Sequence, residues 1–274
     1  MDSLDRAVRQ TLSYGAFFDF PLDLSELHHW LIYPKKVPRS ALIPYHPVLS
    51  PKAIIIKKSL YAQAQQKIGR ASGMASVLSY IPTIKLVAIT GSVAIRNAKK
   101  MDDIDLLIVT ADHTLWLTRP LVLFLLTLLS RRRLPGQDYR SAAHSFCPNL
   151  WLETRALAVP AEKRNLYTAH EVLQVLPILD RSSTYTHFIR ANRWAGEHLA
   201  NAYSASLRKS PSKTRPSSSL LSLIFSPFNF LAFIFQYLYM KPKMSTESVT
   251  LDSAYFHTID FQSRIKRHLD NSLR

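Results

Sequence analysis

The 274-residue sequence contains a single cysteine, Cys147, and only six glycines. One cysteine excludes an intramolecular disulfide and fits a reducing compartment, so we expect a cytoplasmic protein. Cys147 lies in an apolar run directly before a proline, which is typical of a buried thiol and not of a reactive nucleophile. The few glycines, together with 47% hydrophobic residues, exclude a low-complexity chain and predict a folded protein.

Acidic residues are scarce: the chain has 19 Asp and Glu against 35 Lys and Arg, for a net charge of +16. Such a charge attracts polyanions, so a nucleotide, RNA or an anionic membrane surface would each be a compatible partner. The basic runs Lys35-Lys36, Arg131–Arg133 and Arg208–Arg215 are scattered along the chain. They do not define one groove, and a generally basic surface is an equal alternative.

Zinc-finger spacings, the HExxH motif and a cleavable signal peptide are all missing. His170-Glu171 has no second histidine four residues later, so this pair predicts a structural helix and not a zinc protease site. The sequence therefore gives no indication of zinc chemistry or of secretion.

The most informative segment is Val87–Thr110, which predicts an apolar strand, a Gly-Ser turn, a short basic helix and a second apolar strand. The second strand opens with Asp103-Ile104-Asp105. Alternate residues of a strand share a face, so both aspartates point one way and Ile104 points into the core. Two adjacent carboxylates repel each other and are costly to desolvate, which favours a site for a cation such as Mg²⁺.

The turn at Gly91-Ser92 leads into the short helix, and its N–H groups and hydroxyl predict a phosphate site. A pair of metal-binding carboxylates beside a phosphate-binding turn indicates metal-assisted phosphoryl chemistry on a nucleotide.

This arrangement resembles the polymerase-β-like nucleotidyltransferase superfamily: Gly91-Ser92, then ten residues, then Asp103-x-Asp105 followed by Leu106–Val109. Asp102 stands where many members have a serine. The resemblance implies that Asp103 and Asp105 are catalytic and bind two Mg²⁺ ions that bridge an NTP substrate such as ATP. Nucleotide phosphates would be bound by Gly91, Ser92 and a cation, for which Arg96, Lys99 and Lys100 are the candidates.

The likeness extends to most of the chain. Further blocks are similar to segments of uncharacterised bacterial nucleotidyltransferase-domain proteins, although no chemistry is assigned to them: Phe17–Leu22, Leu115–Arg119, Cys147–Leu152, Tyr167–Glu171 and Phe256-His257. These blocks support the subfamily and say little about the substrate.

One departure concerns the third carboxylate that the superfamily usually supplies from a later strand. The matching run is Ser145–Glu153, and its central polar residue is Asn149. An amide can coordinate Mg²⁺ through its carbonyl oxygen, but it brings no charge and cannot act as a base. Asn149, Glu153 and Asp138 remain three candidates for the third ligand.

The expected fold is α+β, with a mixed nucleotidyltransferase sheet and flanking helices. We expect an N-terminal helical, winged-helix-like region over residues 1–56, a nucleotidyltransferase domain over 57–160, and a C-terminal helical region over 161–274 with a mobile loop at 206–219. Asp23 or Ser25 can cap a helix over Glu26–Ile32. That helix lacks base-reading side chains, which favours packing onto the catalytic domain.

The C-terminal region is predicted to be helical on both sides of the loop at 206–219. We expect helices over Arg164–Leu176 and Tyr185–Ala205 and a last helical region over residues 220–273.

The uncharged stretch Ser217–Met240 has two interpretations. Its length suffices to cross a bilayer, which makes a membrane-anchored protein an alternative. Pro227, Asn229 and Gln236 interrupt it and favour a helix packed on the catalytic domain. In that case we expect Gln236 to have an internal hydrogen-bond partner and the large apolar residues to be buried, namely Phe225, Phe228, Leu231, Phe235 and Leu238.

The function expected from these features is a Mg²⁺-dependent nucleotidyltransferase that moves a nucleoside monophosphate from an NTP to an acceptor such as RNA or a protein. Because Asn149 stands where a third carboxylate is expected, the alternative is a degenerate nucleotidyltransferase fold that binds nucleotide or RNA without catalysis.

Overall fold

The computed structural model describes residues 3–129, 132, 145–208, 224–256 and 261–272. Its centre is a six-stranded sheet with the strand order β4-β1-β2-β3-β6-β5. The strands are β1 (Ile84–Ile89), β2 (Ile104–Thr110), β3 (Phe146–Glu153), β4 (Leu176–Asp180), β5 (Ser248–Val249) and β6 (Ser253–Tyr255). β2 and β3 run parallel and the other neighbours antiparallel, so the expected α+β class with a mixed sheet and flanking helices is confirmed.

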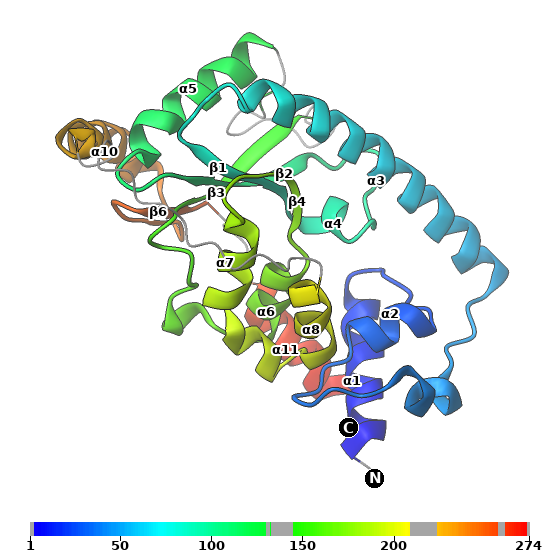
Figure 1. Ribbon diagram of the computed structural model, residues 1–274. Helices are drawn as coiled ribbons and strands as arrows, with labels where there is room; N and C mark the ends of the chain where they lie inside the picture. The colour runs from blue at the N-terminus through cyan, green and yellow to red at the C-terminus, as the bar shows by residue number, and fades with distance from the viewer. Residues whose placement is uncertain (1–2, 130–131, 133–144, 209–223, 257–260, 273–274) are drawn as a thin grey trace.

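Helices cover both faces of the sheet (Figure 1). One face carries α3 (Pro51–Leu78), α5 (Leu115–Leu128) and α10 (Ser226–Met240), and its core includes Ile104 and Ile108. The other carries α6 (Leu166–Leu173), α7 (Thr184–Ala191) and α8 (Ala200–Arg208), and its core includes Leu107 and Val109. Burial on both sides explains the nearly continuous apolar run of β2.

The N-terminal helices are α1 (Ser3–Phe17) and α2 (Leu24–His29), and they pack against α11 (Phe261–Ser272) and α8, respectively. Asp23 caps α2, and Glu26 completes a capping box, as the sequence predicted for Asp23. The Asn201 side chain of α8 donates a 2.8 Å hydrogen bond to the His28 carbonyl. α2 is therefore packed against α8, which belongs to the predicted C-terminal helical region, and it also meets Lys57 of α3, which pairs with Asp23 and Glu26.

The helices α1 and α11, which are far apart in the sequence, lie side by side (Figure 1). Ile265 and Leu269 of α11 are buried against Tyr14 of α1. The last helix therefore supports the first.

Several predicted boundaries differ from the structure. α6 ends at Leu173, and Leu176–Asp180 forms edge strand β4, where Pro177 is tolerated. Residues 185–205 form α7, a 3₁₀ helix and α8 in place of one helix, and the last region contains the β5–β6 hairpin.

α3 begins at Pro51, across the expected boundary at residue 56, and described residues 33–50 contain no β-hairpin wing. Of the expected loop 206–219, residues 206–208 belong to α8 and the others lie outside the described residues.

The predicted orientation of α10 is wrong. Phe225, Phe228, Leu231, Phe235 and Leu238 are all exposed, whereas Asn229 is buried. The reason is hydrogen bonding to α5: Asn229 Oδ1 accepts from the Trp116 backbone N–H at 2.8 Å, and Gln236 Nε2 donates to the Trp116 carbonyl at 2.6 Å. The internal partner expected for Gln236 is thus confirmed.

Within the described ranges, no helix is both long and apolar enough to cross a bilayer. Residues 217–223 of the uncharged stretch lie outside those ranges.

Candidate functional site

The two predicted aspartates lie together at the start of β2. Asp103 precedes the strand, Asp105 is its second residue, and Ile104 between them is fully buried. Because β3 runs parallel to β2 and Cys147 pairs with Asp105, the thiol joins the carboxylates. One ligand atom from each of these three residues lies within 4.8 Å of the others. This set is called the acidic cluster below.

The Gly91 turn lies directly against the acidic cluster. Gly91 begins the four-residue helix α4 (Gly91–Ala94) with φ of +63°. A Cβ atom at this position would lie 2.9 Å from Asp105 Oδ2. Glycine is therefore required here both by the left-handed backbone and by the close approach of the carboxylate.

Asp102 organises the loop and is not a member of the acidic cluster. Its Oδ2 accepts hydrogen bonds from the Ser92 hydroxyl at 2.8 Å and from the Lys99 backbone N–H at 2.9 Å. The Ser92 hydroxyl expected to bind phosphate is therefore already used within the loop. Asp102, which stands where many superfamily members have a serine, thus holds the loop between the Gly91 turn and β2 in place.

Lys67 of α3 is a buried cation beneath this loop that the sequence analysis did not identify. Its Nζ donates to the carbonyl oxygens of Lys100, at 3.2 Å, and Asp102. Burial lowers the pKa of Lys67, while Asp102 and Asp103 act in the opposite direction. The available signal was a lysine on the small-residue face of a helix, between Ala64 and Ala71, both of which are buried.

Of the three predicted phosphate-binding cations, one lies at the site. Lys99 lines the cavity described below and pairs with Asp19 at 3.4 Å. Arg96 is exposed and stacks 5.2 Å from the ring centroid of Tyr61, away from the cavity lining, and Lys100 is exposed outside it. The structure thus does not bring Arg96 to the acidic cluster.

Asn149 is the candidate third ligand that reaches the acidic cluster. Its Nδ2 donates a 2.6 Å hydrogen bond to Asp105 Oδ1. Its buried Oδ1 has no hydrogen-bond partner among the described residues. An unpaired buried carbonyl oxygen is a polar atom of the kind that a ligand or ion satisfies.

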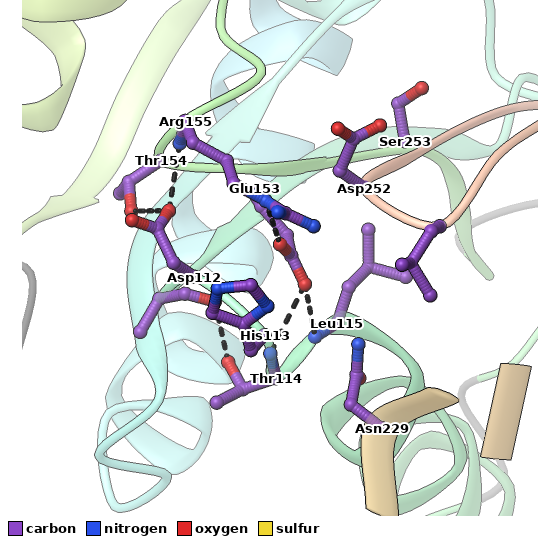
Figure 2. Close-up of polar contacts among 12 residues, drawn as sticks. Asp112, His113, Thr114, Leu115, Glu153, Thr154, Arg155, Asn229, Asp252 and Ser253 are labelled. Carbon is purple, nitrogen blue, oxygen red and sulfur yellow. Dashed lines mark hydrogen bonds and ion pairs between the residues drawn. The ribbon is translucent and has the colours of Figure 1, made fainter. Parts of the chain in front are cut away.

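Glu153 is engaged elsewhere, at the far end of β3 (Figure 2). Its Oε1 accepts from the backbone N–H groups of Thr114 and Leu115 at 3.1 and 3.2 Å, and Oε2 pairs with Arg155 at 2.8 Å. Glu153 therefore closes the N-terminus of α5 and does not lie in the acidic cluster. Asp138 lies outside the described residues.

A cavity of about 570 Å³ opens over the acidic cluster. Its lining includes Gly91, Ser92, Asp103, Asp105 and Asn149. Aromatic side chains from segments far apart in the sequence also line it, namely Tyr14, Phe18, Phe20, Trp30, Tyr167, Phe256 and Phe261. The cavity therefore offers both carboxylates and flat apolar surfaces to a ligand.

His170 and Glu171 line the same cavity from α6. His170 is buried and stacks on Tyr14 with the ring centroids 4.0 Å apart. Burial lowers the pKa of His170 to about 3, so its ring is neutral, and raises the pKa of Glu171 to about 7. The sequence predicted the helix and missed its place in the cavity wall, because no local pattern shows which residues α1 will cover.

Comparison of the chain with protein families, with curated proteins and with solved structures finds no match. The chemistry of the acidic cluster is then the main indication of function. Two carboxylates are hard oxygen ligands suited to Mg²⁺ or Mn²⁺, whereas the Cys147 sulfur is a soft ligand that Mg²⁺ does not favour.

Proposed function

We propose that this chain is a Mg²⁺-dependent nucleotidyltransferase of the polymerase-β-like superfamily, which moves a nucleoside monophosphate from an NTP to an acceptor. The observation that carries the proposal is the placement of Asp103 and Asp105 within 4.8 Å of each other and against the Gly91 turn. Turn and strand are separate in sequence, and the motif that resembles the superfamily requires that they meet.

The oxygen atoms of Asp103 and Asp105 are ligands that suit Mg²⁺, and these two residues would hold the ion. Asn149 is the added oxygen donor, because its carbonyl oxygen lacks a hydrogen-bond partner among the described residues. When bound, Mg²⁺ would neutralise the charge of the triphosphate and of the leaving pyrophosphate.

The residues of the chain have distinct roles in this proposal. Gly91 lets the backbone approach the metal-binding carboxylate, and Lys67 holds the carbonyl oxygens of the connecting loop. Lys99 is the cation available to the phosphates. The aromatic walls suit a nucleobase, since every base offers a flat face for stacking.

The test is transfer of label from α-³²P-labelled NTPs to the macromolecules of a cell extract, with and without Mg²⁺. We expect Mg²⁺-dependent labelling and its loss in Asp103→Asn/Asp105→Asn. The matched control is Glu162→Gln/Asp270→Asn, which makes the same charge change at exposed positions. Labelling by the Asp103/Asp105 variant at the level of the parent would place the reaction elsewhere.

A second candidate function is nucleotide binding without transfer. It is favoured by Asn149, which occupies the place of the third carboxylate and donates to Asp105. This alternative predicts that Mg·ATP raises the melting temperature while no extract component becomes labelled. If Asn149→Asp then gains transfer activity, the missing carboxylate is the reason for the inactivity of the parent chain.

A further inference from the structure

α5 and α10 share an exposed apolar surface on the outside of the molecule. The two helices lie side by side (Figure 1), with the buried Asn229 bonded to α5. The surface consists of large side chains that point away from the protein, among them Leu121, Phe124, Leu128, Phe228, Phe235 and Leu238. We call it the α5/α10 surface.

The exposure follows from how α10 is held. Its inward face carries Asn229 and Gln236, which satisfy the Trp116 backbone groups, and Gln236 also accepts from Arg119 at 2.9 Å. These polar anchors fix the rotation of the helix and direct its phenylalanines outward, with Phe235 73% exposed. Clustered exposed apolar side chains mark an interaction site, because single exposed apolar residues are common and continuous groups are not.

The segments that contain α5 and α10 carry basic residues and no acidic ones. The sequence has no acidic residue between Asp112 and Asp138 or between Glu197 and Glu247. At the end of α10, the exposed Lys241 and Lys243 place their ammonium groups 5.8 Å and 4.0 Å from the ring centroids of Tyr237 and Tyr239. An apolar face bordered by aromatic rings and lysines is typical of helices that lie in a membrane interface.

We propose that the α5/α10 surface docks this protein on an anionic lipid bilayer, with both helices parallel to the membrane plane. The apolar side chains would enter the acyl boundary while Lys241 and Lys243 meet lipid phosphates. Helices of 14 and 15 residues suit this position and are short for a span. A second copy on the same surface would bring two cationic borders together, which is unfavourable.

Flotation with lipid vesicles tests the proposal on the full chain. Vesicles of phosphatidylcholine with one quarter phosphatidylglycerol should bind the protein, and pure phosphatidylcholine should bind it more weakly. Phe228→Ser/Phe235→Ser should lower the partition coefficient by roughly a hundredfold, because two large apolar side chains no longer leave water. The matched control is Ile43→Ser/Val48→Ser, which removes two exposed apolar side chains from segment 39–50, on the opposite side of the molecule from α5 and α10 (Figure 1).

Equal binding by both double variants would show attraction by net charge alone and overturn the proposal. So would no binding to the anionic vesicles, or a dimer in sedimentation that Phe228→Ser/Phe235→Ser dissociates, which would assign the surface to a second copy. A second experiment keeps the surface apolar by using Phe235→Trp. Lipids with brominated acyl chains should quench the fluorescence of this tryptophan. Val48→Trp, in the exposed segment 39–50, should not be quenched, and equal quenching of the two would also overturn the proposal.

Discussion

Gly91 determines at the scale of one residue how closely the turn approaches Asp105. Gly91→Ala forces a side chain into the left-handed region and to 2.9 Å from the carboxylate. We expect the free energy of unfolding to fall by roughly 1–3 kcal/mol. Urea unfolding measures this, and the increase in melting temperature caused by Mg·ATP should also shrink, since Asp105 is displaced.

The control is Gly73→Ala inside α3, where a Cβ atom would meet nothing within 4 Å. Alanine is the better helix former, so this variant should gain about 0.5–1 kcal/mol. Equal losses in both variants would contradict the role given to the Gly91 turn.

Glu171 should make stability depend on pH. Burial raises its pKa to about 7 from 4.5, so the folded state favours the protonated acid. Its contribution is full below pH 4.5 and is lost as the pH rises through 7. Glu171→Gln removes this loss, and its free energy of unfolding relative to the parent should rise by roughly 1–3 kcal/mol between pH 5 and pH 8.

Thermal or urea unfolding at several pH values measures the difference, with Glu162→Gln at an exposed position as the control. His170 acts in the opposite direction, because its lowered pKa costs stability as the pH falls below 6.5. It is present in parent and variant alike, so it cancels in the comparison. A constant difference between Glu171→Gln and the parent would contradict this prediction.

Local patterns predicted part of the site. The alternation around Ile104 placed Asp103 and Asp105 on one face because strand geometry repeats every two residues. Lys67, His170 and Glu171 were missed because their place depends on how distant segments pack. Glu153 stayed one of three candidates for the third ligand, because alternation gives its face but not which residues of β2 pair with β3.

At the scale of elements, α5 is capped by distant side chains. Its N-cap, Thr114, makes no side-chain capping bond, and Glu153 and Asn229 instead accept from the first N–H groups. Glu153→Gln leaves the Arg155 charge unpaired and weakens the cap. We expect a loss of about 2–3 kcal/mol in urea unfolding and faster amide exchange at Thr114 and Leu115.

The same variant tests whether Glu153 is a metal ligand. The shift in melting temperature caused by Mg·ATP should persist in Glu153→Gln, because the carboxylate lies at the opposite end of β3 from Cys147. Loss of that shift, with Glu162→Gln unaffected, would contradict the structural role assigned to it.

The orientation of α10 could not be predicted from its apolar residues. The three-and-four spacing selected the side that carries Phe228, Leu231, Phe235 and Leu238, although apolar residues surround the whole helix and other sides fit as well. The unpaired backbone groups of α5 decide it, because a buried N–H without a partner costs more than an exposed phenylalanine. The inward face of α10 could therefore be identified only by knowing that the first turn of α5 lies opposite Asn229.

At the scale of the whole molecule, sheet class and central strands could be predicted, whereas the docking of α11 on α1 could not. Leu269→Ala opens the packing against Tyr14, on which His170 stacks. We expect a loss of about 2–3 kcal/mol and weaker protection by Mg·ATP in thermal melts. Lys266→Ala, exposed on the same helix, should change neither.

The meeting of α1 and α11 also has a consequence for biosynthesis. α1 leaves the ribosome before α11, so its apolar face is completed only when residues 261–272 have emerged. Until then Tyr14 and its neighbours remain without their final partner, and the aromatic cavity cannot close. Until α11 has emerged, the nascent chain would therefore expose a binding surface for chaperones, and ligand would be bound only after the synthesis of α11.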